Sequence, residues 1–160
     1  METLQKLAAA FDKIAADLPQ QIGTLAVNFS KQRFVSQNWH DKTAEPWQRR
    51  TRKRRGGKKR QKGAVLVDSG RLKRSIRITS VTKTSVTIGT DVEYAKIHNE
   101  GFDGVQSVRA HTRKTKNKTQ NVRAHTRKMK MPQRRFLGES AELERLITEF
   151  IENELKTAIQ

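Results

Sequence analysis

The stretch SIRITSVTKTSVTIG, residues 75–89, has the clearest strand pattern in the sequence. Apolar and polar residues alternate in its first part, where Ile76 and Ile78 share one face, and they alternate again at Val86 and Ile88. A short polar turn separates the two parts. Alternation on both sides of a polar turn is typical of an antiparallel β-hairpin, so the sequence predicts one here.

Strands are expected on both sides of this hairpin. Residues 64–67 form a short apolar run that ends at the Asp-Ser-Gly turn of residues 68–70. Apolar content resumes over residues 92–98 and stops at the Asn-Glu-Gly of residues 99–101. We therefore expect a small antiparallel sheet over residues 64–98.

Helices are predicted near the two ends of the sequence. Apolar residues recur every three or four positions through residues 3–37. Pro19 suits the first turn of a second helix, so this segment is either one kinked helix or two. A stripe of the same period runs through residues 139–159, where Ser140 suits the N-cap. The pattern predicts one α+β domain, residues 1–160, with a small antiparallel sheet packed against N-terminal helices and a C-terminal helix.

Positive charge is concentrated in two segments. The chain has 34 Lys and Arg against 16 Asp and Glu, a net charge of +18. Ten of the fourteen residues 49–62 are basic, and residues 109–135 hold eleven more basic residues with no acid. Without these 21 cations, 13 remain against 16 acids, so the rest of the chain is nearly neutral. Such density favours a polyanionic partner. The alternative is a pair of solvated loops or a nuclear-targeting-like sequence.

The first basic segment, residues 39–63, has too little apolar content for a core, and we expect a long loop that orders only on a partner. Trp39 and Trp47 lie in it. We expect Trp39 to close the core beside Phe34, and Trp47 could instead stack on a base or seat on a partner.

The second basic segment, residues 105–131, contains a repeat. Val-Arg-Ala-His-Thr-Arg-Lys occurs at residues 108–114 and again at residues 122–128. Two short copies are too few for a solenoid, so we predict a long basic hairpin whose arms carry them. The residues expected to contact DNA or a partner are Arg49, Arg50, Arg52, Lys53, Arg54, Arg55, Lys58, Lys59, Arg60, Arg109, Arg113, Lys114, Arg123, Arg127 and Lys128.

Catalytic and cofactor motifs are not seen in the sequence. There is no glycine-rich phosphate loop and no nucleophile elbow, and the chain has no cysteine. His111 and His125 could face each other across the hairpin and bind a metal, but the neighbouring cations oppose this. No secretory signal or membrane-spanning run is visible, so we expect a soluble protein that is not an enzyme and needs no cofactor or metal.

Three motifs follow one another in a specific order. They are VDSGRLKRSI at residues 67–76, IGTDVEYAKIHNEG at residues 88–101 and MPQRRFLG at residues 131–138. This series resembles the phage virion morphogenesis family, which includes tail-completion proteins, over roughly residues 38–140. Met131 replaces the family's usual aliphatic residue, and the first basic loop is unusually rich in arginine. The matching residues expected to define the fold are Gly70, Leu72, Ile76, Tyr94, Ala95, His98, Gly101, Pro132, Arg134 and Phe136.

These motif residues also have expected packing roles. Gly70 permits a tight turn before Leu72 and Ile76 enter the sheet. The apolar residues of the second motif are expected to pack the sheet against the helices, with His98 capping the strand end. The third motif, with Pro132, is expected to direct the chain from the hairpin into the last helix.

The resemblance implies a structural protein of a tailed bacteriophage, assembled in the bacterial host cytoplasm and located in the virion at the head–tail junction or tail end. It implies a ring of this chain, a hexamer being one option, beside neck, connector, tail terminator or tube proteins. The basic segments would then meet packaged DNA or acidic faces of neighbours, and no membrane is involved. The alternative is a free nucleic-acid-binding protein, although no helix-turn-helix, zinc-finger or RNA-binding signature is seen.

Overall fold

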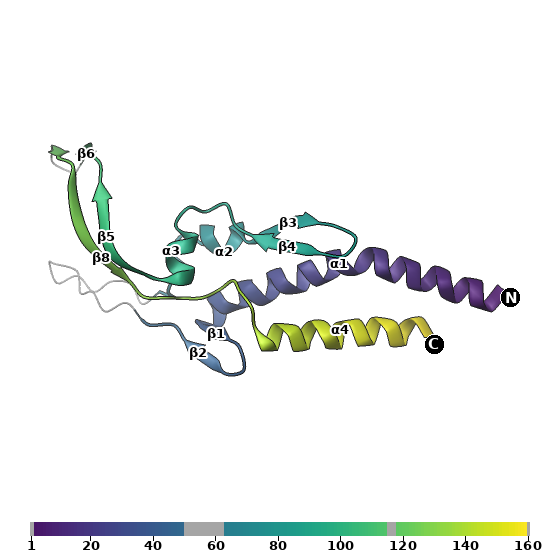
Figure 1. Cartoon of the computed structure of the whole chain (residues 1–160). Coiled ribbons are helices and arrows are strands. Elements are labelled where there is room, and N and C mark those ends of the chain that lie inside the picture. Colours follow the sequence, from purple (N-terminus) through teal and green to yellow (C-terminus); the bar gives the residue numbers. More distant parts are fainter. Residues whose placement is uncertain (1, 50–62, 115–117, 160) are drawn as a thin grey trace.

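The computed structural model describes residues 2–49, 63–114 and 118–159. It confirms an α+β fold with a long N-terminal helix and a C-terminal helix (Figure 1). The elements in order are α1 (Glu2–Ser36), β1 (Asn38–His40), β2 (Ala44–Pro46), α2 (Arg71–Ser75), β3 (Arg77–Val81), β4 (Val86–Gly89), α3 (Ala95–Glu100), β5 (Phe102–Val108), β6 (His111–Lys114), β7 (Thr119–Val122), β8 (His125–Met131) and α4 (Ala141–Ile159).

The molecule is elongated, with chemically different ends. In Figure 1, α1 and α4 run side by side toward the two termini, while the β5–β8 ribbon projects at the opposite end. The strands of the described part do not form one sheet. They form four separate two-stranded antiparallel sheets, pairing β1 with β2, β3 with β4, β5 with β8 and β6 with β7.

The N-terminal segment is one helix, which settles the choice left open by Pro19. A proline inside a helix removes one backbone hydrogen bond, and packing on both sides of it must compensate. α1 packs against α4 and against the β3–β4 ribbon. The ribbon approaches closely at Gly23, where an added Cβ would lie 2.6 Å from Val86 Cγ2 and 2.8 Å from Ile78 Cδ1. This glycine therefore permits the helix-to-ribbon contact.

The predicted hairpin at residues 75–89 is confirmed as β3–β4, but the strand predicted over residues 64–67 is wrong. Val65 is buried in a turn, and its N–H donates to Gln37 Oε1 at 2.5 Å. Gln37 Nε2 donates to the Val65 carbonyl at 3.1 Å. A side chain thus satisfies the backbone groups that a neighbouring strand would otherwise have paired.

The motif at residues 67–76 enters a helix before it enters a sheet. Gly70 has φ 70° and lies just before α2, so its tight turn is present. Leu72 is buried within α2, and Ile76 follows the helix in extended conformation, so the expectation that Leu72 enters the sheet is wrong. Leu72 and Ile76 lie four positions apart, which places both on the core side of a helical turn.

The strand predicted over residues 92–98 is also wrong, because α3 begins at Ala95. Val92 and Ala95 are both buried, and a spacing of three suits one side of a helical turn. A short apolar run does not distinguish a strand from a buried helix segment. His98 consequently lies within α3 and does not cap a strand.

Residues 38–46 form the β1–β2 hairpin, where a loop was predicted. The segment is ordered because Trp39 and Trp47 are both buried in the protein interior. The Trp39 ring meets Phe29 edge-on at 5.9 Å, and the Trp47 ring meets Phe34 edge-on at 5.4 Å. Trp39 is buried as expected, but Trp47 occupies the expected position beside Phe34.

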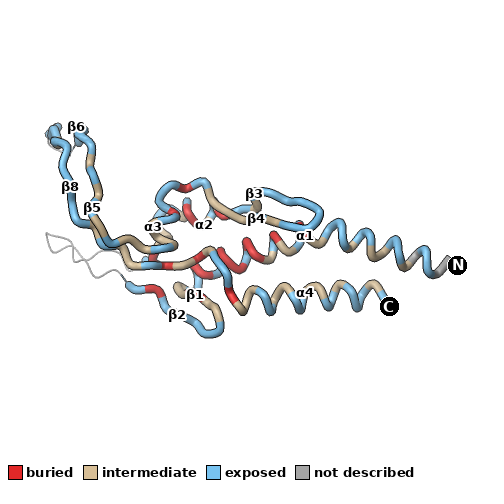
Figure 2. The backbone as a smooth tube through the Cα atoms, in the orientation of Figure 1, coloured by how far each residue is buried: buried red, intermediate tan, exposed pale blue. Residues whose placement is uncertain are grey.

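The core lies in the middle of the molecule. Figure 2 shows the buried positions gathered where the C-terminal half of α1 meets α2, α3 and the chain leading to α4. Phe34, Ile76 and Phe136 are its most completely buried large side chains. By contrast, α4 has no buried residue along its whole length. No helix in the described part of the chain is long and apolar enough to cross a membrane.

The described residues between 102 and 131 form two antiparallel ladders, as expected for the arms of the predicted long hairpin. β5 pairs with β8 from Phe102↔Met131 to Val108↔His125, and β6 pairs with β7 from His111↔Val122 onward. The same register continues across a short interruption between the two ladders. The hairpin begins three residues before the predicted start at residue 105.

Candidate partner-binding groove

The second and third sequence motifs are joined through one amide side chain. Asn99 Oδ1 accepts the backbone N–H groups of Phe136 and Leu137, each at 2.9 Å. Asn99 Nδ2 donates to the Leu137 carbonyl at 3.0 Å. The Arg134 N–H donates to the His98 carbonyl at 2.7 Å, which extends the connection. The sequence patterns did not identify Asn99 as a site residue. The Asn-Glu-Gly of residues 99–101 indicated only the end of the apolar run before it.

Gly101 completes this connection by permitting close approach. It has φ 78°, and an added Cβ would lie 3.0 Å from the Gln133 nitrogen and 3.2 Å from the Met131 carbonyl oxygen. A left-handed backbone conformation favours glycine. The strand β5 can therefore leave α3 directly beside the chain that returns from β8.

The returning chain is also bonded to the β1–β2 region. Trp47 Nε1 donates to the Arg135 carbonyl at 2.9 Å, and Arg134 Nε donates to the Gln48 carbonyl at 3.1 Å. Arg134 is buried, so its side chain contributes to packing as well as to this hydrogen bond. These bonds hold the residues after the first hairpin against the third motif.

A groove of about 1050 Å³ lies where these segments meet the base of the basic hairpin. Its lining includes six cations, Arg49, Arg71, Arg127, Lys128, Lys130 and Arg134, against one acid, Asp68. The groove therefore favours an anionic surface. Nine predicted site residues line it: Arg49, Gly70, Leu72, Tyr94, His98, Arg127, Lys128, Pro132 and Arg134.

Tyr94 gives the groove an aromatic wall. Its ring meets the His98 ring edge-on at 5.9 Å, and the side chain remains substantially exposed. Packing of the second motif thus comes from Val92 and Ala95, whereas Tyr94 faces the groove. A phenol beside cations can contact either apolar or polar groups of a partner.

Other predicted site residues lie elsewhere. Ile76, Ala95 and Phe136 are in the core. Arg109, Arg113, Lys114 and Arg123 lie exposed farther along the hairpin. Arg50, Arg52, Lys53, Arg54, Arg55, Lys58, Lys59 and Arg60 lie outside the described residues.

The hairpin cations are almost unopposed by acids. Arg127 donates to Gln106 Oε1 through Nε at 3.1 Å and Nη2 at 2.7 Å. Lys130 lies 3.2 Å from Asp103 in an exposed ion pair. From residue 104 to residue 131 the sequence contains no Asp or Glu. The hairpin therefore presents a long cationic surface.

The two repeat histidines do not pair across the hairpin. His111 is opposite Val122, and His125 is opposite Val108. Each imidazole Nδ1 lies 2.9 Å from the carbonyl oxygen of the arginine two residues earlier. The described residues contain no cluster of three or more potential His, Cys, Asp or Glu metal ligands.

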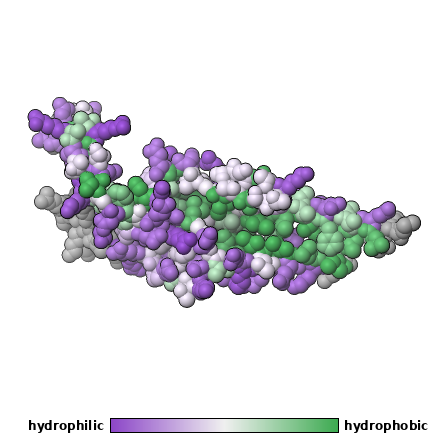
Figure 3. All heavy atoms as spheres, viewed as in Figure 1, coloured by the Kyte–Doolittle hydropathy of each residue, from purple (hydrophilic) through white to green (hydrophobic). Residues whose placement is uncertain are grey.

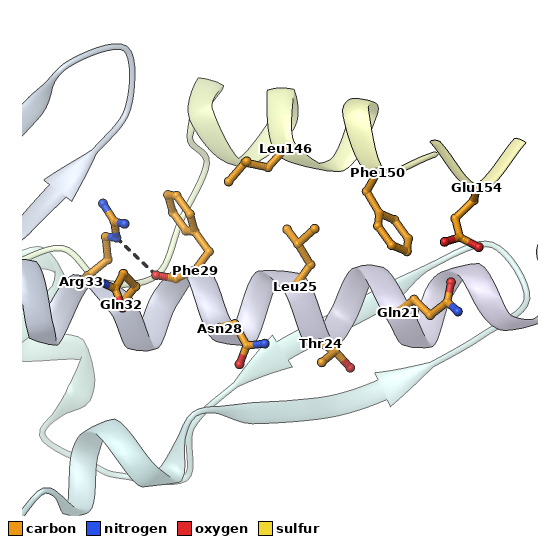
Figure 4. Close-up of a pocket in the computed structure, with 10 residues that line it drawn as sticks. All are labelled: Gln21, Thr24, Leu25, Asn28, Phe29, Gln32, Arg33, Leu146, Phe150 and Glu154. Carbon is orange, nitrogen blue, oxygen red and sulfur yellow. Dashed lines mark hydrogen bonds between the residues drawn. The ribbon is translucent and has the colours of Figure 1, made fainter. Parts of the chain in front are cut away.

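A second groove of about 720 Å³ lies between α1 and α4, and its ten lining residues include four apolar and six polar ones. Leu25 and Phe29 of α1 point toward Leu146 and Phe150 of α4 (Figure 4). Figure 3 shows that hydrophobic residues continue over this face of the helices toward the termini. We call this helical part the α1–α4 arm.

Polar side chains line both ends of this groove, with Arg33 at the inner end and Gln21 and Glu154 toward the termini (Figure 4). Arg33 donates to the Phe29 carbonyl at 3.2 Å, and its guanidinium lies 4.4 Å from the Phe29 ring centre. Burial lowers the pKa of Arg33, and the charge of Glu142 acts in the opposite direction. Ser140 Oγ accepts the Leu143 N–H at 3.1 Å, which confirms the predicted N-cap, and donates to the His40 carbonyl at 2.6 Å.

Comparison with known proteins identifies one family. The model of the phage virion morphogenesis family matches residues 1–156. No curated protein and no solved structure matches the chain. The match covers both the groove and the α1–α4 arm.

Proposed function

We propose a specific place in the virion for this chain, on the premise that it belongs to the phage virion morphogenesis family. Membership supports a structural role in building the bacteriophage particle. The proposed place is the head–tail junction or tail end, where the protein completes the tail and joins it to the head. It acts there by assembly, without catalysis or a cofactor.

The observation that carries this proposal is the incomplete burial of the α1–α4 arm. Every residue of α4 is at least partly exposed, and Leu4 and Ile159 are 74% and 67% exposed. Large contiguous apolar surfaces mark interaction sites. A ring of copies, a hexamer being one option, would cover the arm through subunit contacts.

The basic groove and hairpin supply a second kind of contact. They lie toward the opposite end of the molecule from the termini (Figure 1). In a ring, these cations would repeat around the symmetry axis and face packaged DNA or acidic surfaces of neighbours. Connector, neck, tail terminator and tube proteins are the proposed neighbours.

Solution mass gives a direct test of ring formation. Light scattering of the purified protein at low and high salt is expected to show one closed oligomer, because apolar burial depends weakly on screening. A monomer at both salt concentrations would contradict self-assembly through the arm alone. Addition of purified connector or tail proteins would then test assembly that requires a partner.

A phage that lacks the protein tests the place in the virion. Electron microscopy is expected to show DNA-filled heads and complete-length tails that remain separate. Complementation with the intact gene should restore joined particles. Joined, infectious particles in the absence of the protein would overturn the proposed place.

The charged segments have their own test in the same complementation system. Neutralising the arginines of residues 49–55 is expected to lower the yield of infectious, DNA-retaining particles. An equal yield would show that this segment contacts neither DNA nor an acidic neighbour in a way that matters for assembly.

A free nucleic-acid-binding protein is the second candidate, favoured by the projecting basic hairpin. It would bind duplex as a monomer and would be absent from purified particles. Mass spectrometry of those particles separates this candidate from a virion component.

A further inference from the structure

Acidic residues are concentrated in one part of this basic chain. Residues 139–154 contain six of the 16 acids and a single base, Arg145. Arg145 pairs with Glu142 and Glu149 within α4. Glu144 has no ion pair with any residue in the described part of the chain. This segment therefore carries surplus negative charge on a molecule whose net charge is +18.

The outer side of α4 combines acids with an apolar residue. Four exposed residues follow one another at spacings of four, four and three, so they share one stripe of the helix: Glu144, Thr148, Glu152 and Leu155. Glu152 lies 3.7 Å from Lys156 in an ion pair whose two side chains are both exposed. α4 lies across α1 from the β3–β4 ribbon (Figure 1), so this outer stripe faces away from the body.

The basic groove has the complementary composition. Two of its six cations, Arg71 and Lys128, are exposed and have no ion pair with a described residue. Methionine side chains adapt readily to the shape of a partner. The apolar part of the lining contains two of them, and consists mainly of Leu66, Tyr94, Met129, Met131 and Pro132. A stripe that mixes carboxylates with an apolar side chain matches both parts of this lining.

The two surfaces are similar in length. The outer stripe from Glu144 to Leu155 extends ~16 Å, given a rise of about 1.5 Å per residue. The groove wall formed by residues 127–132 extends ~17 Å, given a rise of about 3.3 Å per residue in a strand. Three turns of α4 can therefore lie along this wall.

The groove and the outer stripe are separate surfaces of one subunit. No described lining residue of the groove belongs to α4, and α4 is packed along α1. A subunit therefore does not fill its own groove with its own helix. Two different surfaces that match each other form a heterologous contact, and repetition of such a contact generates a ring when the rotation closes.

We propose that the outer stripe of α4 docks in the basic groove of the next copy, head to tail. Glu144 and Glu152 then meet the cations of the groove, and Leu155 packs on its apolar part. The inference rests on the proposed ring and deepens it by naming the two surfaces that hold neighbouring copies together. The hairpin beyond the groove is left for another component.

Duplex DNA fits the groove less well than a second copy does. A phosphate backbone would pair with the cations, but it would leave Tyr94, Met129 and Met131 without an apolar partner. The outer stripe supplies both kinds of group. Its apolar part also keeps the contact formed at high salt, because screening weakens mainly the exposed charges.

Charge reversal on either surface tests the contact in the full-length protein. The stripe variant carries Glu144→Lys and Glu152→Lys, and the groove variant carries Arg71→Glu and Lys128→Glu. Each variant alone sets like charges against each other, so its dissociation constant for self-association should rise about 10–100-fold. Sedimentation velocity over a series of protein concentrations measures this constant.

Mixing the two variants tests the pairing itself. The new lysines of the stripe variant then meet the new glutamates of the groove variant, and the unchanged surfaces of the two variants meet each other. The equimolar mixture should associate with a dissociation constant within about threefold of the parent's, and so should one chain that carries all four substitutions.

Two control variants carry the same charge changes at other exposed positions. Asp12→Lys with Asp17→Lys matches the stripe variant, and Lys42→Glu with Lys83→Glu matches the groove variant. Each control should self-associate with a dissociation constant within about twofold of the parent's, because isolated surface charges contribute little. Circular dichroism and thermal unfolding verify that every variant folds.

Three results would overturn the proposal. A parent that stays monomeric over the whole concentration series would show that copies do not dock on one another. A mixture that associates no better than its two components would show that the outer stripe and the groove do not meet. Equal losses in the controls would show that overall charge, not this contact, governs association.

The phage separates this proposal from the wider function. The parent and the variants are expressed in a phage that lacks the gene, and head–tail joining is scored by microscopy. Failure of the mixture to associate, with joining still restored by the parent, overturns the contact and leaves the place in the virion intact. Restored association in solution, with particles that join without the protein, overturns the proposed place alone.

Discussion

Asn99 illustrates how one residue can join segments that are distant in the chain. Its amide both accepts and donates hydrogen bonds, and all three bonds go to the backbone at Phe136 and Leu137. Phe136 is in the core and Leu137 packs against it. The amide thus holds the chain that enters α4 against α3.

Replacing this amide should destabilise the fold. Asn99→Ala would remove three bonds and leave partly buried N–H groups without that acceptor, and we expect a loss of about 2–3 kcal/mol in the free energy of unfolding. Urea denaturation followed by circular dichroism measures it. Asn99→Asp retains an acceptor for both N–H groups and should lose less. Equal stability of Asn99→Ala and the parent would contradict the structural role.

Gly23 makes a second residue-scale prediction. Gly23→Leu would place side-chain atoms where Val86 and Ile78 already lie, so we expect about 1–3 kcal/mol of destabilisation despite the better helix propensity of leucine. The matched control is Ala16→Leu at an exposed position of the same helix. If both variants unfold at the same urea concentration, α1 and the β3–β4 ribbon do not approach as described.

At the scale of elements, hydrogen bonds fix the first turn of α4, and its later turns pack along α1. Ser140 caps α4, and Asp41 Oδ1 accepts the Ala141 N–H at 2.7 Å. Within the helix, Arg145 donates to Glu142 at 2.8 and 2.9 Å and also contacts Glu149. The bond from Arg145 lowers the pKa of Glu142.

This shift predicts a pH-dependent contribution from Glu142. Its pKa in the folded protein lies below the ordinary value of 4.5, so its stabilising effect is present above that pH and is lost as pH falls through the folded-state pKa. The melting temperature of Glu142→Gln should be lower than that of the parent at neutral pH, and the difference should narrow in acid. Glu144→Gln removes the same charge from the same turn as a control. A difference that is constant with pH would contradict the assignment.

At the scale of the whole molecule, the two ends differ in what they present. The α1–α4 arm offers apolar surface, and the hairpin end offers cations with few acids. The core between them holds both ends in one orientation. A subunit of this shape can contact its own copies at one end and another component at the other.

A charge at the exposed end of the arm should therefore affect assembly more than folding. Ile159 is 67% exposed, so Ile159→Asp should leave the monomer's melting temperature nearly unchanged. Burying the new carboxylate in a subunit contact is costly, so the oligomer mass measured by light scattering should fall. Asn153→Asp adds the same charge at an exposed position of the same helix and should leave the mass unchanged. An unaltered mass for Ile159→Asp would place the subunit contact elsewhere.

Local sequence patterns predict the α+β class, the β3–β4 hairpin and the capped C-terminal helix, because each depends on a period or a cap within a few neighbouring residues. The three motifs also contain several of the residues that line the basic groove. Residues 64–67 and 92–98 were assigned wrongly because a short apolar run has no period long enough to distinguish strand from helix or turn.

Local patterns do not predict which distant segments meet; the folded structure shows these contacts. Trp47 beside Phe34, Gln37 on Val65 and Asn99 on Phe136 each join residues whose sequence neighbours give no sign of the partner. The same holds for the continuity of α1 through Pro19, which packing against α4 and the β3–β4 ribbon supports. Local periodicity sets an element, but burial and hydrogen bonding between remote segments set where that element lies, and these energies exist only once the chain has folded.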